Sequence, residues 1–295
     1  MKTLILYFLF SIQPDTSAAV RSVVSIPEIL MHRAEALWVE DRSSIKKALA
    51  SKITSRVPLI VHVFVPLCDN INQGIVPVNS KLGDGMNLST NLYWGAGYGV
   101  RSYFKLKTDW KLSLQLTNPD SNILERVVFR KTMSNGTAII MIADAYRGDR
   151  MKQCLRTYMH SLAGTLHDSI TLSDKQYPIH SGADLLIFNG HNGLMDDTLT
   201  PVLNVDRRPK DAMIIACYSN FYFRAYLQRS GGYPLITTTG LLAPEAYVIH
   251  AAIENWALQK SENEIRIAAG DAYYAKHPSS TQRGCRGLFR TGWAD

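Results

Sequence analysis

Short apolar runs rich in β-branched residues recur along the chain from Val57 onward, and polar or glycine residues follow them. Runs of this length without polar alternation are typical of strands that are buried on both faces of a sheet. The pattern therefore predicts six strands, over residues 57–65, 125–131, 137–143, 183–189, 212–216 and 234–239.

Segments with apolar residues at helical spacing lie between several of these runs. They predict helices over residues 89–104, 149–163, 220–228 and 244–258, the last with Pro244 at its start. The connection 194–211 has no clear helical period. Alternating strands and helices predict an α/β fold: a mostly parallel six-stranded sheet with helices on both faces, a flavodoxin-like three-layer sandwich.

The residues before the first strand have a different pattern. An apolar stripe from Ile29 to Trp38 predicts a first helix. Ser43 or Ser44 could cap a second, short helix that ends near Ala50. We expect a helical segment over 19–52, the α/β domain over 53–275 and a basic C-terminal tail over 276–295.

The first 18 residues have the layout of a signal peptide. Lys2 precedes an apolar run from Leu4 to Ile12, and small residues follow up to Ala19. The alternative is a buried first strand. The run is shorter than the roughly 20 residues that cross a bilayer as a helix, so we expect no stable membrane insertion and a secreted or periplasmic protein.

Composition adds to this interpretation. With 295 residues, 46% of them hydrophobic and 19% charged, the chain can bury a large core. The net charge of +7 is modest, and the basic clusters are not interleaved with aromatic residues as in a groove for single-stranded nucleic acid. We therefore predict no nucleic-acid partner.

The cysteines and glycines indicate no cofactor and no metal site. The four cysteines form no CxxC pair and have no histidine at zinc-finger spacing. The glycines within residues 94–99 lack the GxGxxG spacing of a nucleotide loop. Export would permit one disulfide among Cys68, Cys154 and Cys285, with the pairing left open.

Two predicted strands end at residues with complementary chemistry. The fourth run ends at His191, in DLLIFNGHNG, and the fifth ends at Cys217, in DAMIIACYSN. If these strands are neighbours, their axes lie about 4.8 Å apart. An imidazole close to a thiol can take its proton and generate the nucleophilic thiolate, and backbone amides near Gly193 and Cys217 are possible oxyanion donors.

These two blocks resemble the caspase, legumain, clostripain and gingipain clan of cysteine peptidases, in which one strand ends in His-Gly and a later one in Ala-Cys. The resemblance implies a caspase-like sandwich and an acyl-enzyme mechanism on a peptide or protein substrate. It implies that His191 is the general acid/base, Cys217 the nucleophile and Gly193 an oxyanion donor. Asn192 stands where the clan usually has glycine, and the gap between the blocks is shorter than expected, so processing into two subunits does not follow from the resemblance.

Two other functions stay open at this point. A substituted glycine at position 192 is also expected in a catalytically inactive binding module of the same fold, in which histidine and cysteine are structural. An acyl-transfer enzyme that uses Ser219 is a third hypothesis, although the GxSxG motif is absent.

Four further residues are weaker site candidates. Asp144 ends a predicted strand at the same edge, where it would orient His191, line a pocket or cap the next helix, and we count Asp144 and Asn192 as possible cleft residues. The adjacent Asp196 and Asp197 could bind a metal or a basic side chain, or simply be solvated. The sequence gives no oligomeric state.

Overall fold

The computed structural model describes residues 41–293, all of which belong to one compact unit. The predicted signal peptide and the stripe up to Trp38 lie outside these residues, so both stay predictions. The helices are α1 (Ser43–Thr54), α2 (Val100–Lys107), η2 (Gly148–Arg150), α3 (Met151–Ala163), α4 (Ser219–Ser230), α5 (Ala246–Ala257), α6 (Glu262–Tyr274) and α7 (Gln282–Gly287). The strands are β1 (Leu59–Pro66), β2 (Lys111–Thr117), β3 (Ile123–Thr132), β4 (Ala138–Tyr146), β5 (His167–Leu172), β6 (Lys175–His180), β7 (Leu185–Asn189), β8 (Lys210–Ile215), β9 (Gly232–Thr238) and β10 (Phe289–Arg290).

A mixed sheet of eight strands forms the centre of this unit, in the order β10-β9-β8-β7-β1-β4-β3-β2. The strands β4, β1, β7, β8 and β9 are parallel, and antiparallel strands flank them on both sides. The expected α/β class with a mostly parallel sheet is therefore confirmed. The expected count of six is wrong, because β2 and β10 extend the sheet, and β5 and β6 form a separate hairpin.

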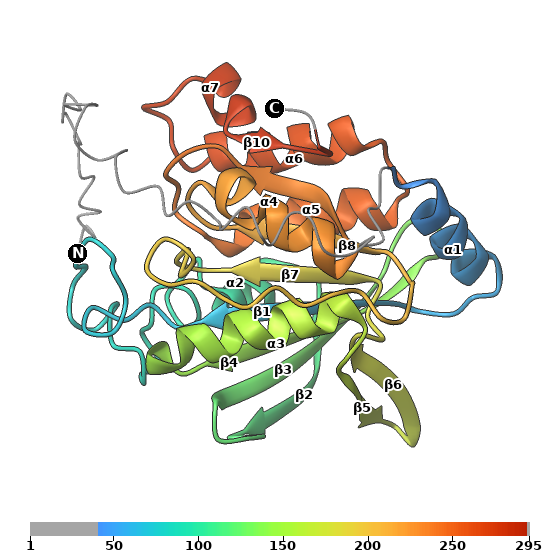
Figure 1. Ribbon diagram of the computed structural model, residues 1–295, viewed down its shortest axis with the longest axis horizontal. Helices are drawn as coiled ribbons and strands as arrows, with labels where there is room; N and C mark the ends of the chain where they lie inside the picture. Colours follow the sequence, from blue (N-terminus) through green and yellow to red (C-terminus); the bar gives the residue numbers. More distant parts are fainter. Residues whose placement is uncertain (1–40, 294–295) are drawn as a thin grey trace. The chain divides into compact units, whose positions relative to one another are not determined.

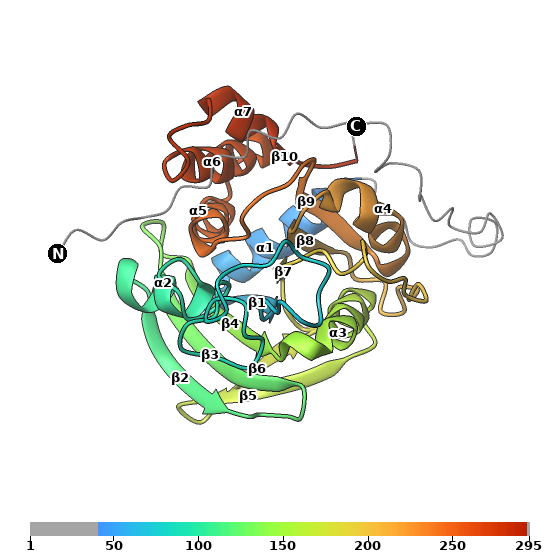
Figure 2. The same cartoon turned by 90° about the vertical axis from the view of Figure 1, so that its left-hand side faces the viewer.

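Helices cover both faces of the sheet, as expected (Figure 1). One apolar cluster joins the sheet to α1, α2, α5 and α6, and the other joins it to α3, α4 and the β5–β6 hairpin. Figure 2 looks along the strands and separates the two layers. The central strands β1, β7, β8 and β9 are buried along their whole length, which explains their unbroken apolar runs.

Strand β3 is antiparallel to its neighbour β4. The two strands are joined by residues 133–137, which contain Asn135 and Gly136. Gly136 has φ +82°, a conformation that glycine adopts without the steric cost of a Cβ. A connection this short makes a hairpin, whereas a parallel crossover needs a dozen or more residues.

Of the helix expected over residues 89–104, only residues 100–104 are helical, and they belong to α2, which continues to Lys107. Residues before Val100 form a packed loop, in which a Cβ on Gly95 or Gly99 would collide with backbone atoms of the loop itself. Trp94 anchors this loop: it is fully buried, and its Nε1 donates to Oε2 of Glu125 at 2.5 Å.

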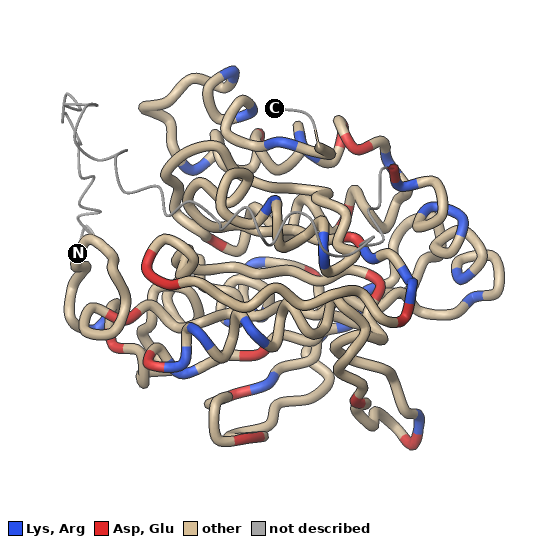
Figure 3. Tube along the Cα trace, viewed as in Figure 1, with Lys and Arg blue, Asp and Glu red and all other residues tan. Residues whose placement is uncertain are grey.

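The segment expected as a basic tail belongs to the folded unit. After α6, residues 276–293 include α7 and β10, and Phe289 and Arg290 of β10 pair with β9. Its charges are not set apart from the rest, since Lys and Arg positions are spread over the described chain together with Asp and Glu positions (Figure 3). No helix within residues 41–293 is long and apolar enough to cross a membrane.

A buried polar cluster lies on the face covered by α3. Oδ1 and Oδ2 of Asp144 accept hydrogen bonds of 2.6 and 2.8 Å from Arg126, and Nε2 of His62 lies 2.9 Å from Oδ2. Nδ1 of His62 accepts from the backbone N–H of His180 at 3.1 Å, so Nε2 carries the proton of the neutral ring. Burial lowers the pKa of His62, and burial beside His62 lowers the pKa of His180 to about 3.

Acid should therefore destabilise the protein partly through His180. Between pH 6.5 and about 3, the unfolded chain binds a proton that folded His180 does not, so the free energy of unfolding falls as the pH falls. One such group contributes up to about 1.4 kcal/mol per pH unit. His180→Asn, which suits the positive φ of 53°, should flatten the pH dependence of urea unfolding over this window. His167→Asn, at an exposed position, is the control; an unchanged slope in His180→Asn would contradict the assignment.

Candidate functional site

His191 and Cys217 occupy equivalent positions at the ends of two adjacent parallel strands. The last register pair of β7 and β8 is Asn189 with Ile215, and His191 and Cys217 each follow two residues later. The pairing continues past the strands, because the N–H of Gly190 donates to the Ile215 carbonyl at 3.2 Å. The structure thus confirms that the two predicted strands are neighbours with their carboxyl ends at one edge of the sheet (Figure 2).

Asn192 joins the two loops directly. Its Nδ2 donates to the backbone carbonyl of Cys217 at 2.6 Å, and its Oδ1 accepts from the N–H of Leu194 at 3.1 Å. The side chain is fully buried, so both of its polar ends are satisfied inside the protein. Where the resembling peptidases have glycine, this chain has a side chain that fixes the histidine loop to the cysteine loop.

His191 contacts a carboxylate that belongs to its own loop. Nε2 of His191 lies 2.6 Å from Oδ2 of Asp196, and the same oxygen accepts from the N–H of Gly74 at 3.2 Å. An ionised carboxylate only accepts, so Nε2 carries a proton and Nδ1 is the basic nitrogen of the neutral ring. Asp196, for which the sequence left a metal, a basic side chain or solvation as alternatives, is therefore the residue that orients the imidazole.

Cys217 is partly exposed, whereas the other three cysteines are buried. All four are free thiols, so the disulfide that the sequence left open among Cys68, Cys154 and Cys285 is not formed. The Sγ atom donates to the Leu242 carbonyl at 3.7 Å and makes no hydrogen bond with the imidazole of His191, which is also among the described residues. Burial raises the pKa of the Cys217 thiol. In this conformation, position 217 therefore carries a protonated thiol.

The start of α4 follows Cys217 closely in the chain. Tyr218 has φ 51°, and α4 begins at Ser219, so the chain turns sharply between β8 and the helix. Backbone hydrogen bonds at Leu242 and at Cys217 itself lower the pKa of the thiol, but burial raises it by more.

Gly193 is placed for packing rather than for catalysis. Its N–H donates to the His191 carbonyl at 3.1 Å, so in this conformation it does not point a free donor at an oxyanion. A Cβ at this position would collide with Cγ of Met151 and approach Leu155 on α3 to 3.0 Å. The glycine lets the histidine loop lie directly on α3.

Asp144 is not part of this site. It is fully buried in the middle of the cluster with His62 and Arg126, and it neither orients His191 nor caps the next helix. Arg126 and His62 hold the pKa of this carboxyl below its usual range against the effect of burial. Its role is structural, because removing one partner of a buried ion pair leaves the other charge uncompensated.

The serine hypothesis is also contradicted. Ser219 is fully buried, and its Oγ donates to the Ile214 carbonyl at 2.8 Å. The same oxygen accepts from the N–H of Thr238 at 2.9 Å. A hydroxyl held in this way inside the start of α4 is not available to a substrate.

Comparison of the chain with protein families, with curated proteins and with solved structures finds no match. Within residues 41–293, no group of three or more His, Cys, Asp and Glu side chains is placed to hold a metal ion. The interpretation of the site therefore depends on its geometry.

Iodoacetamide should label Cys217 before the other three thiols in the native protein, because Cys68, Cys154 and Cys285 are buried. Since burial raises its pKa, the labelling rate should still increase above about pH 9, as more thiolate forms. Peptide mass mapping after timed labelling measures both properties. Cys285→Ala is the matched control and should leave the rate at Cys217 unchanged, whereas a rate that levels off near pH 6 would contradict the raised pKa.

Proposed function

We propose that the protein is a cysteine-type hydrolase of peptides, with Cys217 as the nucleophile and His191 as the general acid/base. The observation that carries the proposal is the equivalent placement of the two residues on adjacent parallel strand ends, tied together by Asn192. Since the axes of neighbouring strands lie about 4.8 Å apart, a thiol and an imidazole on such loops would be within reach of one substrate carbonyl.

The contacts suggest a sequence of proton transfers. Nδ1 of His191 takes the proton of Cys217 as a substrate carbonyl approaches, and the thiolate adds to the carbonyl carbon. The imidazolium then gives its proton to the leaving amine, which departs and leaves a thioester. Water, deprotonated by the same nitrogen, hydrolyses the thioester and restores the thiol.

Asp196 would act through His191. A carboxylate 2.6 Å from Nε2 stabilises the imidazolium that forms during the first step and keeps the ring from rotating. Since the same carboxylate is held by the N–H of Gly74, the loop after β1 also contributes to the position of the imidazole.

A rim of exposed apolar side chains supports a peptide substrate. These side chains belong to the loops that follow β1, β7 and β9 and to the segment after β8 that includes the first turn of α4, all beyond the carboxyl ends of the strands, where Cys217 also lies. Exposed apolar groups gathered at one site usually mark a surface that binds a partner. The residues are Ile71, Val76, Met195, Tyr218, Phe221 and Leu241.

The fold is consistent with the resemblance to the caspase and legumain clan. The five parallel strands have the order of a flavodoxin-like doubly wound sheet, in which chemistry gathers at the carboxyl ends of the strands. A caspase-like sandwich, with His191 and Cys217 in the clan's two strand-end positions, is the arrangement we propose.

A second candidate function is a binding module that holds an apolar peptide at the same edge without cleaving it. One contact favours it: Sγ of Cys217 donates to the Leu242 carbonyl, and burial raises the pKa of the thiol. Such a module would bind peptides equally well with and without the thiol.

Turnover should depend on both residues. We expect the wild-type protein to release peptides from fluorescein-labelled casein, and Cys217→Ala and His191→Ala to lower the rate at least about a thousandfold. Cys285→Ala removes a buried thiol elsewhere and should keep the rate. Equal rates in wild type and Cys217→Ala would refute the proposal, and casein binding without turnover in either would support the binding module.

Asp196→Asn tests the positioning of the imidazole. An amide can keep a hydrogen bond but cannot stabilise the imidazolium, so kcat should fall about 10- to 100-fold with KM little changed. Asp197→Asn is the neighbouring control, because that carboxylate pairs with Lys152 instead. If the loss appears only in KM, or equally in both variants, Asp196 does not act through His191.

A further inference from the structure

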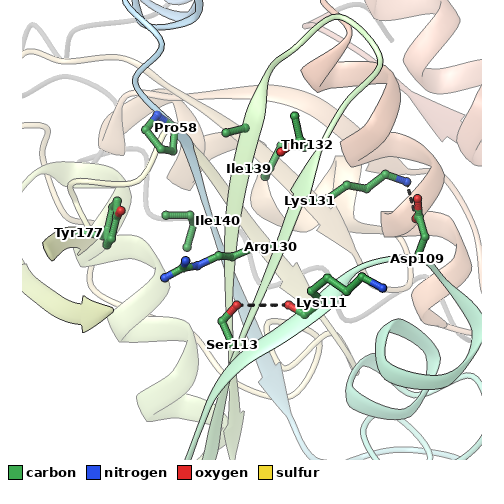
Figure 4. Close-up of a pocket in the computed structure, with 11 residues that line it drawn as sticks. Pro58, Asp109, Lys111, Ser113, Arg130, Lys131, Thr132, Ile139, Ile140 and Tyr177 are labelled. Atoms are coloured by element: carbon green, nitrogen blue, oxygen red, sulfur yellow. Dashed lines mark hydrogen bonds and ion pairs between the residues drawn. The ribbon is translucent and has the colours of Figure 1, made fainter. Parts of the chain in front are cut away.

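A groove lies at the amino ends of β1 and β4, at the opposite end of the parallel strands from Cys217. It is lined by the start of β2, the end of β3 and the start of β4, together with Pro58 before β1 and Tyr177 of the β5–β6 hairpin (Figure 4). Its volume is about 470 Å³, and a second cavity of about 310 Å³ shares Ser113 and Arg130 with it. Sites for small molecules usually have volumes of roughly 300 to 1,000 Å³.

Two cations in this groove form no ion pair with any residue that the structure describes. Lys111 and Arg130 are register partners on the antiparallel strands β2 and β3, and neither has an ion-pair partner among residues 41–293. Like charges directly opposite each other destabilise a sheet. The neighbouring Lys131, in contrast, is neutralised by Asp109 and Glu254 at 2.5 Å each.

The side chain of Arg130 is also incompletely hydrogen-bonded. Its Nε is buried and has no acceptor in the described part of the protein. The guanidinium extends toward Tyr177, whereas the side chain of Lys111 extends to the side on which Asp109 lies (Figure 4). Arg130 lines both cavities, whereas Lys111 lines only the larger one, so Arg130 is the cation best placed to contact a ligand in either cavity.

We infer that this groove binds the oxyanion group of a small molecule, a phosphate or a carboxylate, at the guanidinium of Arg130, with Lys111 as a second and more distant positive charge. The planar guanidinium matches such groups in a two-pronged hydrogen bond, and the ammonium supplies a second charge. Hydroxyls of Ser113, Thr171 and Ser173 line the second cavity, and an apolar part of the ligand would contact Tyr177. The site is independent of the proposed hydrolase, because it lies at the amino ends of β1 and β4.

Calorimetric titration with phenyl phosphate, and separately with benzoate, tests the site on the full-length protein. At least one of the two should bind, Arg130→Gln should weaken that binding tenfold or more, and Lys111→Gln should weaken it about threefold. Lys105→Gln removes an exposed charge on α2 and should change nothing. The preferred probe identifies the group as a phosphate or a carboxylate.

Two results would overturn the inference: binding of neither probe to the wild type, or equal binding by wild type and a folded Arg130→Gln. Urea unfolding establishes that Arg130→Gln is folded. Arg130→Lys keeps the positive charge but cannot make the two-pronged hydrogen bond, so it should bind with intermediate affinity. Alkylation of Cys217 should leave the affinity unchanged, which separates this site from the proposed active site.

Discussion

The parallel register of β7 and β8 is the constraint on which the rest of the site depends. Both strands are buried along their whole length, and a slip by one residue would turn every side chain to the other face. A buried carboxylate fixes the start of β8: Asp211 accepts two hydrogen bonds from Arg42, of 2.7 and 2.6 Å, and one of 2.8 Å from Trp256. Burial outweighs the opposing effect of Arg42 and raises the pKa of Asp211. The register places His191 and Cys217 at equivalent positions, because each follows the last paired residue of its strand by two residues.

Much of the fold follows from the apolar runs, and the exceptions have identifiable causes. The six predicted strands all exist, since continuous burial leaves a continuous apolar signal. β2 was missed because it is an exposed edge strand whose apolar residues only alternate. α6 was missed although Ser261 and Glu264 form a capping box, a signal that is readable from the sequence. The antiparallel direction of β3 was equally readable from Asn135 and Gly136, which indicate a hairpin.

The sequence could predict only those site residues that directly follow a strand. His191 and Cys217 follow from two apolar runs, but the partner of the imidazole does not, because Asp196 belongs to a loop with no period. Asp144 was a reasonable candidate on the same strand edge, yet Arg126 from the adjacent β3 takes up both of its oxygens. Loop conformation and pairing between strands far apart in sequence decide such contacts, and neither has a local signal.

The state of the Cys217 thiol follows from two opposing effects. Burial disfavours the thiolate, while hydrogen bonding to the backbone lowers the pKa of the thiol. As long as Leu242 accepts the S–H group, burial prevails and the thiol keeps its proton. In the reaction that we propose, a peptide carbonyl entering the site would change the balance, because negative charge would develop on the substrate and the proton would move to Nδ1 of His191, whose Nε2 faces Asp196. A raised pKa in the free protein is thus compatible with catalysis, provided that the proton leaves only when substrate is bound.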